Sequence, residues 1–294
     1  MNNALILLAA YNGKAWISSQ IKTILNQDID KIYLYIGDDN SNDSSIQILP
    51  RDANVKVKLH NSDQSGAANN FFNLIRNSDL SEFEFIALSD QDDIWDPDKL
   101  SSAIKMLKEM EGDAYSSNVT AFWADGKTKL IDKAQTQREF DYMFESAGPG
   151  CTFVLTQKLA LHLQQFLIQN QHASKDVALH DWFIYAFARV NDYKWVIDKQ
   201  PHMQYRQHEK NVVGANVGLQ AKLIRWNKLR AGWLHTQAIL LADIIGYSDS
   251  WVIKRLKRNN LIDKIVLIIN VSKFRRKFID RLALAASFLV GIKK

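Results

Sequence analysis

The sequence predicts a mixed α/β fold, in which a mostly parallel β-sheet is flanked by helices and followed by a helical, basic C-terminal region. In the first half, short apolar runs typical of buried strands alternate with segments that repeat apolar residues at helical spacing. This alternation favours parallel strands covered by helices. From about Leu219 onward the sequence is instead helical in pattern, basic and aromatic.

The individual elements follow in chain order. Asp96 is expected to cap a helix opened by Pro97, because proline suits the first helical position. Other helices are expected from Ile17, from Ala67, at 159–167 and at 177–190. Strands are expected at residues 4–9, 32–36, 55–59, 83–88, 115–123, 152–155 and 195–197.

The length of 294 residues allows one large domain or a domain with an appendage. We place the boundary after residue 218, which gives an α/β domain at 1–218 and a helical region at 219–294. The single cysteine, Cys151, excludes an intramolecular disulfide framework and fits a reducing compartment. We expect no signal peptide, because a strand-like run follows Met1 almost directly.

The net charge of +5 conceals an asymmetry along the chain. Residues 251–294 hold 12 Lys and Arg against two Asp, a balance of +10. The first 250 residues therefore hold 25 basic and 30 acidic side chains, a balance of −5. The basic character belongs to the C-terminal region and needs an explanation there.

Three carboxylates follow the strand expected at 83–88, namely Asp90, Asp92 and Asp93. Carboxylates at the C-terminal end of a strand lie where an α/β sheet gathers its ligands. Because three close carboxylates repel one another, a cation is the natural compensation, and oxygen ligands suit Mg²⁺ or Mn²⁺ bridged to a phosphate. The alternative is an acidic surface turn, but the strand before these residues and the helix after them favour a metal site.

Polar residues also follow the first two strands. The first ends at Ala10, Tyr11 and Asn12, and the second ends in a loop that contains Asp39. Parallel strands would bring both ends to the edge that carries the carboxylates. Tyr11 is then placed to cover a nucleotide base and Asp39 to bind the base or a ribose hydroxyl, although the second segment is also typical of a plain loop. Neither glycine-rich nucleotide fingerprint is present, so metal and basic side chains would have to hold phosphates.

Two further segments carry candidate chemistry. Asp181 lies among residues that demand burial, which would raise its pKa towards that of a general base, unless it only caps the helix start. In the segment 204–214, Arg206 and Lys210 are candidates to clamp a diphosphate and His208 to complete a metal site. That segment is also compatible with a solvated loop.

Five segments together resemble the family 2 glycosyltransferases with the GT-A fold, a Rossmann-like α/β fold. The segments are Ala-Tyr-Asn-Gly at 10–13, the Asp- and Ser-rich loop at 38–45, Ser-Asp-Gln-Asp-Asp-Ile-Trp at 89–95, His-Asp-Trp at 180–182 and Tyr-Arg-Gln-His at 205–208. The third and the last are most similar to the bacterial rhamnosyltransferase branch. The resemblance covers residues 3–215 and makes 1–218 a nucleotide-sugar transferase domain.

The resemblance implies an inverting transfer of a sugar from a nucleotide diphosphate, dependent on Mg²⁺ or Mn²⁺. It makes Asp92 and His208 metal ligands, Asp90 a ribose contact or further ligand, and Asp181 the general base. The donor would also contact Ala10, Tyr11, Asn12, Asp39, Arg206 and Lys210. Candidate acceptor contacts are Trp95, Gly150, His180 and Trp182, with His180 standing where the family often has Glu.

The resemblance also implies a biological setting. The donor would be dTDP-L-rhamnose, or another donor such as a UDP-hexose, and the product a bacterial surface polysaccharide. A polyprenyl-linked glycan acceptor would explain the C-terminal region, because basic amphipathic helices with aromatic residues bind anionic membrane surfaces. We therefore expect a cytoplasmic enzyme, peripheral on the inner face of the cell membrane. The apolar stretch at 282–292 is shorter than the ~20 residues that span a bilayer.

Alternative interpretations remain open at this point. The C-terminal helices could form only a solvated cap on the catalytic domain. A sugar nucleotidyltransferase would need a basic glycine-rich loop after the first strand, which Tyr11 to Gly13 does not provide. A non-catalytic glycan- or membrane-binding module on the same fold is disfavoured by the intact Asp92 and Asp181. We find no nucleic-acid-binding motif and expect no such partner.

Overall fold

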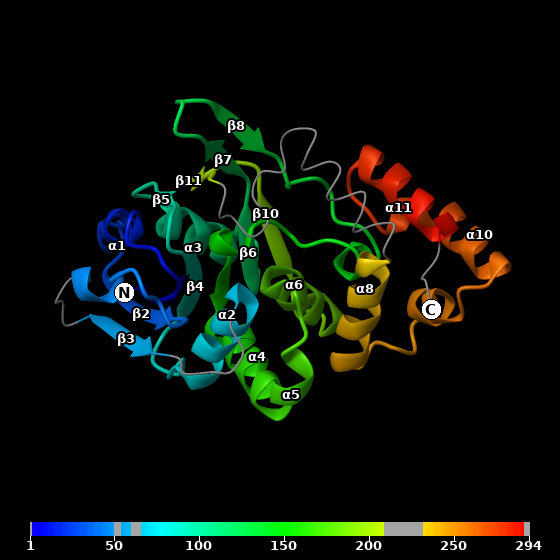
Figure 1. Cartoon of the computed structure of the whole chain (residues 1–294), viewed down its shortest axis with the longest axis horizontal. Helices are drawn as coiled ribbons and strands as arrows, with labels where there is room; N and C mark the ends of the chain where they lie inside the picture. Colours follow the sequence, from blue (N-terminus) through cyan, green and yellow to red (C-terminus); the bar gives the residue numbers. More distant parts are fainter. Residues whose placement is uncertain (1, 50–53, 60–65, 209–231, 291–294) are drawn as a thin grey trace.

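The computed structural model describes residues 2–49, 54–59, 66–208 and 232–290. Its centre is a seven-stranded sheet of order β10-β6-β9-β4-β1-β2-β3 (Figure 1). Only β9 is antiparallel to its neighbours, β4 and β6, so the expected mostly parallel sheet is confirmed. The strands are β1 Asn3–Ala10, β2 Lys31–Asp38, β3 Val55–Leu59, β4 Phe85–Asp90, β6 Ala114–Ser117, β9 Val154–Thr156 and β10 Trp195–Asp198.

Helices cover both faces of this sheet, because β1 is apolar on both sides. Leu5 and Leu7 pack with helices α2, α4 and α6, whereas Ile6 and Leu8 pack with α1 and α3. This alternation is the period of two expected of a strand, and burial on both faces explains its unbroken apolar run. The helices are α1 Ile17–Leu25, α2 Ala67–Asn77, α3 Lys99–Glu109, α4 Gln157–Gln169, α5 Gln171–Ser174 and α6 His180–Val190.

A second sheet of four strands has the order β5-β11-β7-β8. Its strands are β5 Ile94–Trp95, β7 Val119–Phe122, β8 Thr128–Ile131 and β11 Met203–Arg206. Strand β11 is antiparallel to β5 and parallel to β7. Because β5 starts one residue after Asp93, this pairing brings the chain beyond β11 back to the turn that carries Asp90, Asp92 and Asp93, which we call the acidic turn.

Three expected boundaries were wrong. The strand expected at 115–123 is two strands in different sheets, because the Asn118 side chain binds the Lys199 carbonyl and the Lys133 amide at the break. Helix α3 begins at Lys99, so neither Asp96 nor Pro97 opens it as expected. Helix α6 begins at His180 rather than at residue 177.

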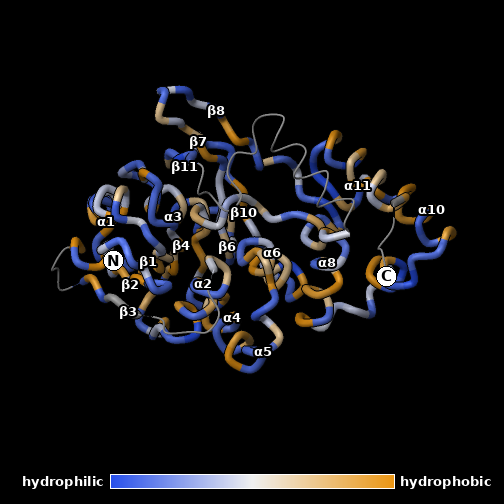
Figure 2. The backbone as a smooth tube through the Cα atoms, in the orientation of Figure 1, coloured by the Kyte–Doolittle hydropathy of each residue, from blue (hydrophilic) through white to orange (hydrophobic). Residues whose placement is uncertain are grey.

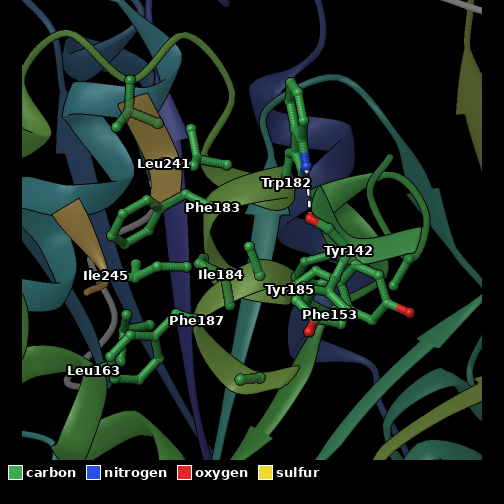
Figure 3. Close-up of a cluster of buried hydrophobic side chains, with 14 of the residues drawn as sticks. Tyr142, Phe153, Leu163, Trp182, Phe183, Ile184, Tyr185, Phe187, Leu241 and Ile245 are labelled. Atoms are coloured by element: carbon green, nitrogen blue, oxygen red, sulfur yellow. Dashed lines mark hydrogen bonds between the residues drawn. The ribbon is translucent and has the colours of Figure 1, made fainter. Parts of the chain in front are cut away.

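The C-terminal helices pack onto the α/β unit. They are α8 Trp233–Ile244, α9 Trp251–Arg258, α10 Leu261–Ile269 and α11 Phe278–Val290. Phe274 and Phe288 belong to the same buried cluster as the α6 side chains, part of which Figure 3 shows. The helical character expected after residue 219 is thus present from Trp233 onward in the described part of the chain.

A buried ion-pair group ties these helices to the α/β unit. The Arg276 side chain is fully buried, with Nε 3.5 Å from Asp141 and a terminal nitrogen 3.3 Å from Glu145. Burial acts to raise the pKa of Glu145, but Arg275 and Arg276 together hold it below its ordinary value. Arg276 therefore compensates two carboxylates that lie some 130 residues earlier in the chain.

We predict that Arg276→Met destabilises the protein by up to about 3–5 kcal/mol, because it removes the buried cation that Asp141 and Glu145 share and leaves them only Arg189 and Arg275. The free energy of unfolding in urea measures this. Lys254→Met is the control, because its pair with Asp249 is exposed and contributes about 0–1 kcal/mol. Equal stability of the two variants would contradict the prediction.

Candidate active site

A cavity of about 790 Å³ opens at the carboxyl ends of β1 and β4 and at the start of α6. It is lined by most of the site residues that the sequence predicts, although these are far apart in the chain. The predicted residues in the lining are Ala10, Tyr11, Asn12, Asp90, Asp92, Gly150, His180, Asp181 and His208. The parallel pairing of β1 with β2 and β4 explains the gathering, since it aligns Ala10 with Asp38 and Ala9 with Asp90.

A reciprocal hydrogen-bond pair joins the ends of β1 and β4. The Tyr11 amide donates to the Gln91 side-chain oxygen at 2.9 Å, and the Gln91 side-chain nitrogen donates to the Tyr11 carbonyl at 2.8 Å. A Cβ atom on Gly13 would lie 2.1 Å from that Gln91 oxygen, so a larger residue there would displace the Gln91 side chain from this pair. The pair fixes the backbone at Tyr11 while its ring stays 55% exposed at the cavity.

The loop after β2 mainly supports the loop after β1. Ser41, Asp43 and Ser45 accept hydrogen bonds from the amides of residues 12–14. Asp39 is buried and accepts from the Gly66 amide at 2.6 Å, which fixes the start of α2 beside the cavity. Asp39 does not itself line the cavity, so its expected contact with a base or ribose remains a prediction.

Asp92 and His208 meet, although 116 residues separate them. His208 Nε2 lies 2.6 Å from Asp92 Oδ2, and the imidazole stacks on the Trp16 ring at 4.2 Å between ring centroids. Trp16 and the carboxylate therefore fix the imidazole on two sides. This contact depends on the pairing of β11 with β5, which returns the chain to the acidic turn.

The acidic turn has a buried layer behind it. Ligand atoms of Asp90, Asp93 and Cys151 all lie within 4.8 Å of one another. Burial, together with the charges of Asp92 and Asp181, raises the pKa of Asp90 to about 7. Burial also raises the pKa of the Cys151 thiol, which keeps it protonated and a poor metal ligand. We therefore assign Asp93 and Cys151 to the support of the site.

Arg206 also lies behind the turn. Its amide donates to Asp93 at 3.1 Å, its Nε donates to the Asp92 carbonyl at 2.7 Å, and its guanidinium covers the Phe122 ring. The side chain is not part of the cavity lining, so its placement does not support the expected diphosphate clamp. It instead holds the backbone of Asp92. Lys210, the other expected clamp, lies outside the described residues.

Asp181 stands at the first turn of α6 and is half-buried in the cavity wall. Its Oδ1 accepts from the Trp182 amide at 2.7 Å. Burial raises the pKa of Asp181 to about 6, against the opposing effects of that amide, Lys133 and Ser146. A carboxylate with this pKa is mostly ionised at neutral pH and remains basic enough to accept a proton.

His180 packs closely between two neighbours. Its ring stacks on Phe71 at 4.0 Å, and a Cβ atom on Gly150 would lie 2.3 Å from its Nε2. Burial lowers the pKa of His180 to about 3, so the ring is neutral. Gly150 thus makes room for an imidazole at the cavity wall, next to Asp181.

The two tryptophans expected at the acceptor side lie elsewhere. Trp95 is 2% exposed, with Lys99 Nζ 3.6 Å from its ring centroid. Trp182 is buried and donates from Nε1 to the Tyr142 carbonyl at 2.8 Å (Figure 3). Neither lines the cavity, so the structure does not support them as acceptor contacts. Each belongs to a buried hydrophobic cluster, so both residues serve packing.

The sequence analysis missed several residues of the cavity wall. Trp16 was not predicted because its partner, His208, is distant in the chain. The β8 strand and the loop after it supply Lys129 to Lys133, a polar segment without a recognisable pattern. Lys277 and Asp280 come from the C-terminal helical region, which the sequence placed outside the catalytic domain.

The residues present fit a divalent cation. Asp92 and His208 are close enough to share one ion, with Asp90 two residues away on the same turn. Carboxylate oxygens with one imidazole suit Mn²⁺ or Mg²⁺, and repulsion among three neighbouring carboxylates favours a bound cation. The geometry thus provides an acidic edge and, across the same cavity, a separate carboxylate of raised pKa.

Comparison with known proteins identifies the family. Residues 5–166, more than half of the chain, match the model of glycosyl transferase family 2. The chain is 39% identical to the dTDP-rhamnosyl transferase RfbG of Shigella flexneri over 292 residues, which cover 97% of this chain and 100% of the relative. The chain is a family 2 glycosyltransferase.

Other relatives of this glycosyltransferase agree. It is 26% identical to the UDP-Glc:alpha-D-GlcNAc-diphosphoundecaprenol beta-1,3-glucosyltransferase WfgD of Escherichia coli, over 53% of this chain and 61% of the relative. The Staphylococcus aureus TarS structure in complex with UDP has a TM-score of 0.56 at 15% identity, and covers 99% of this chain and 89% of its own. A Pyrobaculum calidifontis mannosyltransferase in complex with GDP-Man and Mn²⁺ has a TM-score of 0.51 at 14% identity, over 98% of this chain and 85% of its own. The expected GT-A fold is confirmed.

We predict that Asp92→Ala weakens Mn²⁺ binding by at least about tenfold, because it removes the carboxylate that faces His208. Titration calorimetry with Mn²⁺ measures this directly. Asp132→Ala is the matched control, because Asp132 is an exposed carboxylate in the wall of the same cavity. Mn²⁺ affinity that is unchanged in Asp92→Ala would reject the metal assignment.

Proposed function

We propose that this glycosyltransferase moves L-rhamnose from dTDP-L-rhamnose to a glycan acceptor, with inversion at the anomeric carbon, in the assembly of a bacterial surface polysaccharide. The support for the sugar is the near full-length similarity to a relative named as a dTDP-rhamnosyl transferase. The support for the chemistry is that one cavity gathers Asp90, Asp92, His208 and Asp181.

The donor binds at the β1 and β4 side of the cavity. The exposed Tyr11 ring stacks on the thymine base, and Ala10 and Asn12 form the wall beside it. Asp39 contributes to the nucleoside site, because its carboxylate accepts from the Gly66 amide and so holds the start of α2 beside the donor. Asp92 and His208, with Asp90, would hold Mg²⁺ or Mn²⁺, and the bound cation would supply positive charge to offset the charge on the departing diphosphate.

Asp181 acts on the acceptor. Its carboxylate takes the proton of the acceptor hydroxyl as the oxygen attacks the anomeric carbon from the face opposite the diphosphate. Inversion needs this single in-line displacement, so one carboxylate is sufficient, whereas retaining hydrolases use a second one as nucleophile. Gly150 and His180 form the adjoining wall, where the acceptor sugar is held for attack.

The acceptor is a glycan on a polyprenyl diphosphate, and the enzyme works from the cytoplasmic face of the membrane as a peripheral protein. The support for the lipid is the relative named for an undecaprenol-diphosphate acceptor. None of the helices in the described ranges is both long and apolar enough to span a bilayer. An enzyme of this kind would have to meet its acceptor at the membrane surface.

We predict that dTDP-L-rhamnose gives the highest transfer rate in a panel that also contains UDP-glucose, UDP-GlcNAc and GDP-mannose. Release of the nucleoside diphosphate, measured with a lipid-linked glycan acceptor and Mn²⁺, reports the rate for each donor. Removal of the divalent cation with EDTA should abolish release. A preference for a UDP-hexose would overturn the rhamnosyl assignment and leave the transferase assignment intact.

We predict that kcat/KM for transfer falls about tenfold per pH unit below pH 6, because protonation of Asp181, whose pKa is about 6, removes the base. Asp181→Asn should bind donor normally and lose at least about a hundredfold in kcat. Donor affinity is measured by calorimetry and kcat by the release assay. Asp132→Asn is the control in the same cavity. Full turnover by Asp181→Asn would exclude it as the base.

A further inference from the structure

Helices α10 and α11 expose large apolar side chains along their length. On α10, Ile262, Ile265 and Ile269 are 72%, 48% and 73% exposed. Their spacing of three and four residues places them on one face of the helix. We call the exposed apolar side chains of the two helices the C-terminal apolar face. It comprises Leu261, Ile262, Ile265, Ile269, Phe278, Ile279, Leu282 and Leu289.

This apolar face lies at one end of the molecule. Figure 2 shows hydrophobic segments along α10 and α11, at the end opposite strands β1 to β3. The two helices are in contact with each other, and their buried sides are anchored to the protein by Leu267 of α10 and by Leu284 and Phe288 of α11. Exposed apolar clusters of this kind mark interaction surfaces in soluble proteins.

The basic charge of this region is largely neutralised within the protein. Of the ten Lys and Arg in residues 251–290, seven lie within 4 Å of a carboxylate. The seven are Lys254, Arg255, Lys257, Arg258, Lys273, Arg275 and Arg276. Arg276 is fully buried, and Arg281 donates to the carbonyls of Arg275 and Arg276. The charge balance of the sequence thus overstates the cationic surface, whereas the side chains of the apolar face are 48–77% exposed.

The apolar face is continuous with the cavity. Lys277 and Asp280 line the cavity, and Phe278 and Ile279 between them are 68% and 77% exposed. The first turn of α11 therefore forms part of the cavity wall and part of the apolar face. A surface that covers these side chains would lie directly beside the mouth of the cavity.

A phospholipid surface fits this face better than a second copy of the chain. Lys264 and Lys277 have no carboxylate partner within the described ranges. In a two-fold interface, the same patch meets itself and would bring these cations towards their own counterparts. Anionic headgroups would instead supply partners for both lysines, with the apolar side chains entering the acyl boundary.

We propose that the C-terminal apolar face inserts into a phospholipid monolayer, mainly by apolar burial, and that this places the cavity beside the bilayer. The inference rests on the proposed function, because it makes the start of α11 the wall past which a lipid-linked acceptor enters. It identifies the inserting residues, and it assigns the cations of the region mainly to internal structure. Membrane binding should consequently depend weakly on salt.

The test uses the full chain and vesicles of phosphatidylglycerol and phosphatidylethanolamine. We expect Ile262→Asp/Ile269→Asp on α10, and separately Leu282→Asp/Leu289→Asp on α11, to lower the vesicle partition coefficient at least about tenfold. The matched control is Met110→Asp/Ile168→Asp, which alters two exposed apolar side chains on other helices. Raising NaCl from 0.1 to 0.5 M should change the partition of the unmodified chain by less than about threefold. Transfer to a water-soluble glycan acceptor should be the same in all variants.

The outcomes separate this inference from the proposed function. Loss of vesicle binding in the α10 and α11 variants alone supports insertion, whatever the donor panel shows. If high salt abolishes vesicle binding and the variants still bind at low salt, the inference would be overturned in favour of a purely electrostatic contact. The inference would be overturned in favour of self-association if the chain does not bind vesicles, is dimeric by light scattering, and becomes monomeric in the same variants. A chain that neither binds vesicles nor forms a dimer would also overturn the inference.

Discussion

The concentration of negative charge at the end of β4 constrains the rest of the structure. Asp90, Asp92 and Asp93 cannot all be ionised and close together at low cost, and burial worsens the repulsion. The carboxylates lie at different depths below the protein surface. Asp93 is 1% exposed and is held by the Arg206 amide, whereas Asp92 faces the cavity and His208. A divalent cation bound here would provide the remaining compensation, and it would also offset the charge of a diphosphate leaving group.

The neighbouring elements serve this acidic turn. Gln91 joins it to β1, and strand β11 returns to it through β5. Arg206 shows why residue type alone is a poor guide to role. An arginine in such a site is expected to bind phosphate, but here its guanidinium is engaged by the Asp92 carbonyl and the Phe122 ring. Its effect on the donor would therefore be indirect, through the position of Asp92.

Much of the fold could be predicted from the sequence because its signals are local. The unbroken apolar run of β1 and the helical spacing after Ile17 each reflect burial of that segment. Polar strand ends then identified most of the cavity, since parallel pairing alone brings Asp90 next to Ala9. Signals that depend on distant partners were missed. Trp16 acquires its role only from His208, and the burial of Trp95 and Trp182 depends on tertiary packing.

In the C-terminal region, the sequence likewise could not predict which charged side chains have partners distant in the chain. A count of Lys and Arg predicts a cationic surface, but it cannot reveal that Arg276 is buried between Asp141 and Glu145. Likewise, the expected boundary after residue 218 separates Lys277 and Asp280 from the cavity that they line. The cavity wall draws on both segments.

The link between Gln91 and Tyr11 restricts how this site can change during evolution. The Gln91 side chain donates and accepts at the same backbone position, so neither Glu nor Lys can replace both bonds. A Cβ atom at position 13 would overlap that side chain. A bulkier residue at position 13 would demand a shorter one at position 91. We therefore expect the two positions to vary in concert among homologous sequences, as a pair inherited together.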